Sequence, residues 1–183
     1  MSLYSHKEFQ IHIFRQEKSM LLKTTLIVLL QISSGSYSSE VLFPYLTTLE
    51  TKIDLRQKRQ SYLLKQAQAY KGTTYRKGGE SFWEGFDCSG LTLQLFQGMD
   101  LSLPHSAKLQ SQLGKPVKKK HLETGDLIFF AHNDEISHVA MVLTQDKNGT
   151  HIVHATSSKG VIFEILEQSN YWTERYKMAK RLF

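Results

Sequence analysis

The spacing of apolar residues changes from helical to strand-like along the chain. Residues 55–71 are rich in helix formers, repeat their apolar positions at helical spacing and end at Gly72. They are therefore predicted to form an amphipathic helix. Residues 40–54 have no strong period, which favours a short lead-in strand or linker.

A glycine-rich stretch, residues 72–86, is predicted to be a loop. It leads into DCSGLTLQLFQG, residues 87–98, whose apolar positions indicate a helix that begins at Cys88. A second short helix is expected over residues 106–113, closed by Gly114.

The C-terminal part of the chain is predicted to be a sheet. Its apolar runs are separated by short connections such as HNDEIS and DKNG, which favour antiparallel neighbours. Helices first and a sheet second define an α+β domain. The expected strands cover residues 126–132, 138–145, 150–156 and 160–166, with a further strand over residues 176–183.

The N-terminal segment has the layout of a secretory signal. After Met20 the sequence carries a lysine, an apolar run over residues 26–32 and then small residues. This run is shorter than the roughly 20 apolar residues that span a bilayer, so no stable membrane span is expected. Residues 1–39 are interpreted as a leader, with a translation start at Met20 as one explanation of residues 1–19, and the protein as exported to the periplasm or cell wall. The alternative is a hydrophobic helix packed on the domain.

The composition limits the chemistry that the chain can carry. Lysine and arginine number 23 against 17 aspartate and glutamate, and the charge of +6 favours anionic surroundings without selecting one. Cys88 is the only cysteine in the sequence, which excludes an internal disulfide framework and a multi-cysteine metal site. Cys88 is therefore either a buried small side chain or a reactive thiol.

The position of Cys88 favours the reactive alternative. A cysteine at the start of a helix faces unpaired backbone N–H groups and the positive end of the helix dipole, which stabilise the thiolate. A cysteine nucleophile also needs a histidine base and a third group that fixes the imidazole. His138 starts a predicted strand and His154 lies on the next one, so His154 could sit beside His138, whereas His151 points to the opposite face. The alternative is a set of structural histidines at strand ends.

Six short segments together carry a family resemblance. They are YRKGG (75–79), DCSGL (87–91), LPHSAKLQ (103–110), TGDLIFF (124–130), ISHVAMVL (136–143) and IVHATSSKGVIFEIL (152–166). In this order and spacing, over roughly residues 60–183, the chain resembles the NlpC-type family of papain-like cell-wall cysteine peptidases. The resemblance implies an α+β papain-like fold, in which N-terminal helices carry the nucleophile at a helix N-terminus and pack on a mainly antiparallel sheet. Residues 40–59 would form a lead-in segment.

The resemblance also implies a catalytic set. Cys88 matches the family's nucleophile, His138 its general base and His154 the third polar residue that orients the base. Enzymes of this kind typically hydrolyse the bond between γ-D-glutamate and a diamino acid in peptidoglycan stem peptides, through an acyl-enzyme on the cysteine. No cofactor and no metal are expected.

Three further positions are implied to bind substrate. Tyr75 matches a tyrosine that lines the site and helps to stabilise the oxyanion. Asp87 and Ser89 match the pair that, with this tyrosine, holds the free amino end of a short cell-wall peptide. The chemistry agrees, because a carboxylate accepts hydrogen bonds from an ammonium group and a hydroxyl can add another. The backbone N–H of Cys88 is a second candidate donor to the oxyanion.

The expected partner is therefore peptidoglycan or a muropeptide, and not nucleic acid. An immunity or inhibitor protein would be a further partner if the enzyme were delivered into rival bacteria. Two alternatives stay open, because a fold does not fix a function. One is an acyltransferase, amidase or lipid hydrolase with the same Cys and His chemistry, and the other is an inactive wall-binding module that keeps the groove.

The chain departs from the family pattern at the rim of the expected site. The family often carries arginine where His105 stands, and small or charged residues at the positions of Phe82 and Trp83, so substrate preference there is open. His105 is interpreted as an ordinary loop histidine near the surface, with a contact to substrate as the alternative. The aromatic residues within 171–176 are interpreted as core packing.

Overall fold

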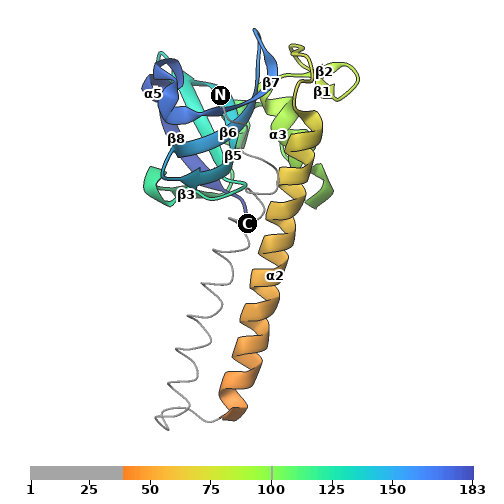
Figure 1. Ribbon diagram of the computed structural model, residues 1–183, viewed down its shortest axis with the longest axis vertical. Coiled ribbons are helices and arrows are strands. Elements are labelled where there is room, and N and C mark those ends of the chain that lie inside the picture. The colour runs from red at the N-terminus through yellow and green to blue at the C-terminus, as the bar shows by residue number, and fades with distance from the viewer. Residues whose placement is uncertain (1–38, 100) are drawn as a thin grey trace. The chain divides into compact units, whose positions relative to one another are not determined.

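The computed structural model describes residues 39–99 and 101–183 (Figure 1). The expected leader and secretion signal, apart from Ser39, therefore lie outside the described residues. The chain divides into two compact units, Met1–Ile53 and Asp54–Phe183. In the described part of the chain, no helix has both the length and the apolar composition needed to cross a membrane.

The first described helix is longer than the sequence pattern indicates. Helix α2 (Ser39–Tyr70) includes residues 40–54, so the expectation of a strand or linker there is wrong. A helix that has nucleated can extend by one hydrogen bond per residue without a new apolar stripe. Pro44 is the exception in this stretch, because its nitrogen has no hydrogen to donate, and the helix continues across it. The apolar face expected further along is present, since Leu63 and Ala67 are fully buried.

The central sheet is six-stranded and antiparallel throughout, as expected for an α+β fold of this type. Its strand order is β3-β8-β4-β5-β6-β7. In the view of Figure 1, helix α3 (Cys88–Phe96) lies to one side of the strands and α5 (Asn170–Arg175) to the other. The strands are β3 (Lys115–Val117), β4 (Leu127–His132), β5 (Glu135–Asp146), β6 (Gly149–Thr156), β7 (Gly160–Ile165) and β8 (Tyr176–Arg181).

The connection between β4 and β5 is tighter than the six residues HNDEIS suggest. Only Asn133 and Asp134 form the turn, with φ angles of 48° and 65°. Two successive left-handed residues make the hairpin turn whose twist matches that of the flanking strands, and asparagine and aspartate tolerate this conformation best after glycine. Strand β5 therefore begins at Glu135, three residues before His138.

The helices after α2 are short, and their ends are set by side-chain caps. Ser106 caps α4 (Ala107–Gln110), which covers only part of the expected helix over residues 106–113. Ser169 caps α5, which the sequence pattern does not predict. A small hairpin of β1 (Glu80–Ser81) and β2 (Gly85–Phe86) occupies part of the expected glycine-rich loop.

The hairpin approaches the start of α3 closely. A Cβ atom added at Gly90 would lie 2.0 Å from the carbonyl oxygen of Gly79. Asp87 N–H donates to the same carbonyl at 2.9 Å. The loop before the hairpin and the first turn of α3 therefore form one packed unit around Cys88.

Candidate active site

Cys88 is the first residue of α3, as the sequence predicts, but its thiol lies in a more enclosed environment than expected. Burial is the largest influence on the pKa of Cys88 and raises it. A hydrogen bond from the backbone N–H of Val139 on β5 lowers the pKa of Cys88, and the nearby charge of Asp87 raises it further. The expected stabilisation of the thiolate by the helix start is therefore outweighed, and the resting group is the neutral thiol.

Asp87 caps the helix and is surrounded by donors. One carboxylate oxygen, Oδ1, lies 2.7 Å from Gly90 N and 3.1 Å from Ser89 Oγ, and 2.9 Å from His105 Nε2. The other, Oδ2, accepts a hydrogen bond from Gly78 N at 2.9 Å. Burial would raise the pKa of Asp87, but the bonds from Gly90 and His105 lead a set of contacts that hold it below its ordinary value. The carboxylate therefore stays ionised beside Cys88.

His105 does more than occupy a surface loop. Its Nε2 faces Asp87, and its Nδ1 lies 3.1 Å from Oε2 of Glu80 on β1. The ring therefore bridges the helix cap and the hairpin, and the interpretation of His105 as an ordinary loop residue understates its contacts. No periodicity in the sequence marks this role, because the three residues come from three separate segments.

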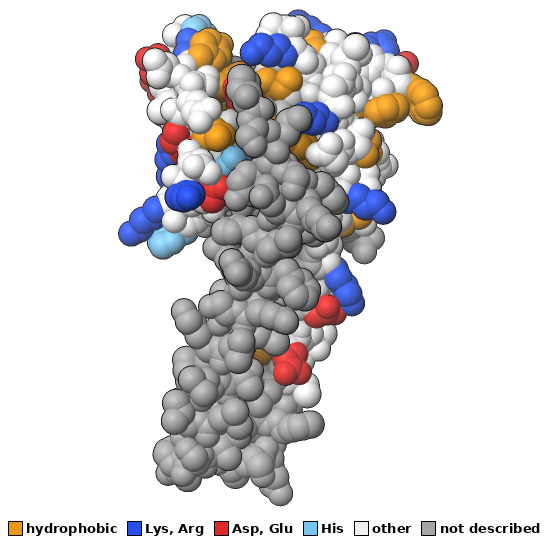
Figure 2. All heavy atoms as spheres, viewed as in Figure 1, with side chains coloured by type: hydrophobic (Ala, Val, Ile, Leu, Met, Phe, Trp, Pro, Cys, Tyr) orange, Lys and Arg blue, Asp and Glu red, His pale blue; other side chains and the backbone are white. Residues whose placement is uncertain are grey.

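The tip of the same hairpin carries exposed aromatic side chains. Phe82 is 47% exposed and Trp83 is 90% exposed, and orange side chains protrude at this corner of the molecule in Figure 2. The Trp83 ring meets the Phe82 ring edge-on, with the ring centroids 5.3 Å apart. The centroid of the Phe82 ring lies 6.3 Å from that of Tyr70 on α2.

His138 and His154 lie side by side on adjacent strands, the arrangement that the sequence suggested. His138 Nε2 is 3.0 Å from His154 Nδ1, whereas His151 pairs with Asp146. Burial, followed by the neighbouring His154, lowers the pKa of His138 from 6.5 to about 3. At neutral pH the imidazole of His138 is therefore uncharged and able to accept a proton.

Glu164 and Trp172 complete the surroundings of the histidine pair. Glu164 Oε1 on β7 lies 2.8 Å from His154 Nε2. The contact with His154 leads the causes that lower the pKa of Glu164, which keeps this carboxyl ionised. The indole of Trp172 on α5 stacks on His138, with centroids 4.3 Å apart and planes 23° apart, and meets His154 edge-on at 5.0 Å.

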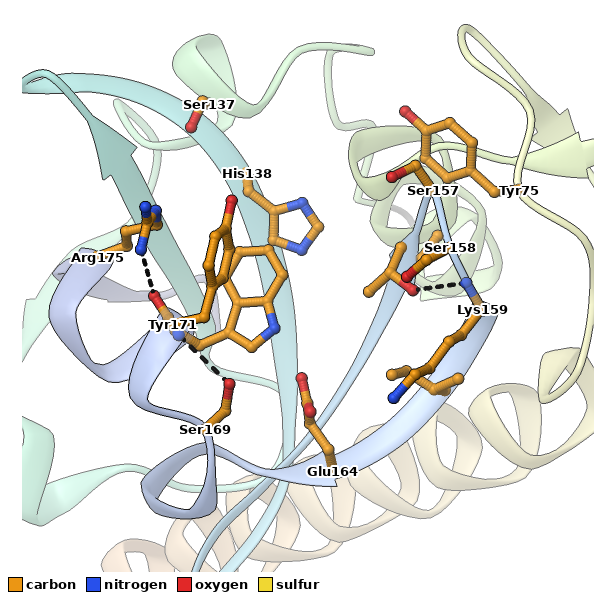
Figure 3. Close-up of a pocket in the computed structure, with 14 residues that line it drawn as sticks. Tyr75, Ser137, His138, Ser157, Ser158, Lys159, Glu164, Ser169, Tyr171 and Arg175 are labelled. Atoms are coloured by element: carbon orange, nitrogen blue, oxygen red, sulfur yellow. Dashed lines mark hydrogen bonds between the residues drawn. The ribbon is translucent and has the colours of Figure 1, made fainter.

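A cleft of about 480 Å³ opens beside these residues. In Figure 3, Tyr171 and Lys159 stand on opposite sides of it, with Glu164 between them at the base and His138 above. Tyr75 also lines the cleft. Burial, then Cys88 and then Asp87 raise the pKa of Tyr75, so the tyrosine is protonated and lies within electrostatic reach of the cysteine.

The structure gathers the sequence-predicted residues around one region. Tyr75 and His138 line the cleft, and His154 lies behind His138. Cys88 is linked to them by the hydrogen bond from the backbone N–H of Val139. Asp87 caps α3, and Ser89 in the first turn donates to it. The sequence did not predict that Glu164 and Trp172 lie beside the histidine pair. Glu164 gives a sequence signal only in hindsight, as a charged residue within an otherwise apolar strand.

The chain matches a known protein family and is similar to curated bacterial proteins. The family model described as "NlpC/P60 family" matches residues 72–181. A Gamma-DL-glutamyl hydrolase of Bacillus subtilis is 33% identical over 148 residues, which are 78% of this chain and 35% of that protein. The Murein DD-endopeptidase MepS/Murein LD-carboxypeptidase of Escherichia coli is 36% identical over 123 residues, or 67% of this chain and 62% of that protein.

Solved structures give the same result. The crystal structure of an NlpC/P60 family protein from Bacillus cereus superposes with a TM-score of 0.60 at 32% sequence identity. The match covers 67% of this chain and 39% of that chain. The present chain thus matches less than two thirds of the length of these relatives.

Proposed function

The chain belongs to the NlpC/P60 family, and from that premise we propose that it is a cysteine peptidase that hydrolyses peptidoglycan stem peptides. The bond we propose joins γ-D-glutamate to a diamino acid. The observation that carries the proposal is the uncharged, buried His138, which lines the cleft and is paired with His154. The next residue, Val139, donates its backbone N–H to the thiol of Cys88. The names of the relatives agree in part, since one acts on γ-glutamyl bonds and another on murein.

In the proposed reaction, Cys88 is the nucleophile and His138 the general base. His138 takes the thiol proton through Nδ1, because Nε2 is engaged with His154. The sulfur attacks the carbonyl carbon, and the C–N bond then breaks as the imidazolium returns the proton to the leaving amine. Water, deprotonated by His138, then hydrolyses the thioester and restores the thiol. The raised pKa of Cys88 means that proton transfer accompanies attack rather than preceding it.

The polar groups around Cys88 have proposed roles in binding. The backbone N–H of Cys88 and the protonated hydroxyl of Tyr75 are the donors for the oxyanion. Asp87 would receive the free amino end of the substrate. Its Oδ1 already has three partners and its Oδ2 one, so we assign the substrate ammonium to Oδ2. Ser89 then acts chiefly by holding Oδ1 in place.

Export to the periplasm or cell wall belongs to the same proposal. The substrate lies outside the cytoplasm, and the sequence after Met20 has the layout of a secretory signal.

The test is mass spectrometry of purified muropeptides after incubation with the protein and with Cys88→Ala. We expect products split between γ-D-glutamate and the diamino acid. The variant should be at least about a thousandfold slower, because it lacks the attacking atom. Its amide spectrum should match that of the wild type, which separates loss of chemistry from loss of fold.

Each alternative gives a different result. Cleavage at a D,D cross-link would retain the peptidase and move the bond. Intact muropeptides with a folded wild-type protein would contradict the proposal and favour an acyltransferase, a lipid hydrolase or a binding module.

A further inference from the structure

Glu164 stands directly behind the histidine pair. In the β6–β7 ladder Ile152 is paired with Glu164 and His154 with Ile162, so Glu164 and His154 are diagonal neighbours on one face of the sheet. Oε1 of Glu164 lies 2.8 Å from Nε2 of His154, the ring nitrogen that faces away from His138. His154 is fully buried and Glu164 is 26% exposed. Both atoms are buried, and in the described part of the chain neither makes a hydrogen bond of standard geometry, so this ion-pair contact is the close polar contact recorded between them.

The proton positions follow from these contacts. An ionised carboxylate can only accept hydrogen bonds, so the proton of a neutral His154 belongs on Nε2. The Nδ1 of His154 is then a lone pair, and it can only accept a hydrogen bond from His138 Nε2–H. That places the lone pair of His138 on Nδ1, the nitrogen left to receive the proton of Cys88.

Without the carboxylate, the same pair of rings has a second arrangement. His154 could carry its proton on Nδ1 and donate it to His138 Nε2, and neutral His138 would then be protonated on Nδ1. In that arrangement His138 cannot accept the thiol proton. The distance of 3.0 Å between the rings is compatible with both directions, so the pair alone does not choose between them.

We propose that Glu164 is a positioning residue that fixes the direction of the hydrogen bonds from His154 to His138 and so leaves His138 Nδ1 free to act as the base. The inference rests on the proposed function only for its effect on turnover, since the tautomers of the two rings are properties of the resting protein. Three groups keep Glu164 ionised for this role: His154, Lys159 and Trp172 lower its pKa.

The test compares Glu164→Met, which keeps the length of the side chain but removes the acceptor, with Glu164→Gln, whose amide oxygen can still accept from Nε2–H. Glu174→Met, on the exposed side of α5, is the matched control for loss of one negative charge. Nitrogen NMR of ¹⁵N-histidine-labelled protein at neutral pH reports which ring nitrogen carries each proton. Backbone amide spectra establish that each variant is folded.

We expect His138 and His154 to be protonated on Nε2 in the wild type and in Glu174→Met. Glu164→Met should show His138 partly protonated on Nδ1, and Glu164→Gln a smaller change. On muropeptides, kcat/KM should fall about 10- to 100-fold in Glu164→Met, the range seen when carboxylates that orient metal-binding histidines are removed. Glu164→Gln should recover part of this loss.

Unchanged histidine tautomers in a folded Glu164→Met protein would overturn the inference, whatever its activity. Recording the spectra in Cys88→Ala as well makes the result independent of catalysis. If the tautomers shift as expected while wild-type protein leaves muropeptides intact, the proposed function fails and the role of Glu164 in the histidine pair stands.

Discussion

The cysteine half and the histidine half of the candidate site are held in place by different kinds of contact. The cysteine half consists of Cys88 and the helix cap, where donors from Gly78, Gly90 and His105 converge on Asp87. These contacts are polar and join separate loops. The histidine half is built on neighbouring strands and covered by an indole ring, and His154 in it is fully buried.

This difference predicts how each half fails. The cysteine half depends on one charged acceptor, so loss of that charge should release several segments at once. The histidine half depends on keeping the uncharged ring of His138 out of water, so acid should destabilise it. Single substitutions in each half can test these two dependencies separately.

The largest effect is expected from acid acting on His138. The pKa of this group is 6.5 when unfolded and about 3 when folded, so between these pH values the unfolded chain binds the proton and the folded chain does not. The free energy of unfolding should therefore fall as the pH drops below 6.5, by about 1.4 kcal/mol per pH unit from this group. Urea unfolding at several pH values should give a shallower slope for His138→Gln.

The control for that slope is His151→Gln, which removes a histidine from the opposite face of β6, where it is paired with Asp146. This variant should keep the wild-type pH dependence in the window between pH 6 and pH 4 more closely than His138→Gln does. Equal slopes in the wild type and His138→Gln would show that burial of this ring does not govern acid sensitivity.

A smaller loss is expected when the acceptor of the cysteine half is changed. Asp87→Asn keeps the shape of the side chain but loses the charge and part of its capacity to accept hydrogen bonds. Asparagine caps helices about as well as aspartate, so we expect the loss, about 1 to 2 kcal/mol, to come from the hydrogen bonds to the charged carboxylate, and chemical denaturation would measure it. Asp134→Asn, at a side chain that is 93% exposed and paired with Lys177, should change stability much less. A similar loss in both variants would contradict the assignment of Asp87 as the organiser of this half.

The smallest effect is expected at the hairpin tip. Trp83→Ser removes a ring that is 90% exposed, so the free energy of unfolding should change by no more than about 0.5 kcal/mol. Trp172→Ser removes a ring packed against Phe130 and the histidine pair and should cost more. A large loss of stability in Trp83→Ser would show that the hairpin tip supports the cysteine half after all.

Much of the fold follows from local sequence patterns. Each of the main strands is found within a few residues of its expected position, because apolar runs separated by short polar connections mark strands and turns strongly. The N-terminal extension of α2 and the short helix α5 were missed. The first lacks an apolar period, and the second is only six residues long and is held by a cap and by Trp172 packing on the core cluster.

The sequence by itself determined that Cys88 begins a helix and that His138 and His154 share one face of neighbouring strands. Both results depend on spacing along the chain, which a helix or strand converts into direction. Only the tertiary structure decided that the thiol is buried enough to raise its pKa, that His105 bridges Asp87 and Glu80, and that Glu164 and Trp172 surround the histidine pair. Those properties depend on which distant segments meet and how much water they exclude, and no local pattern encodes either.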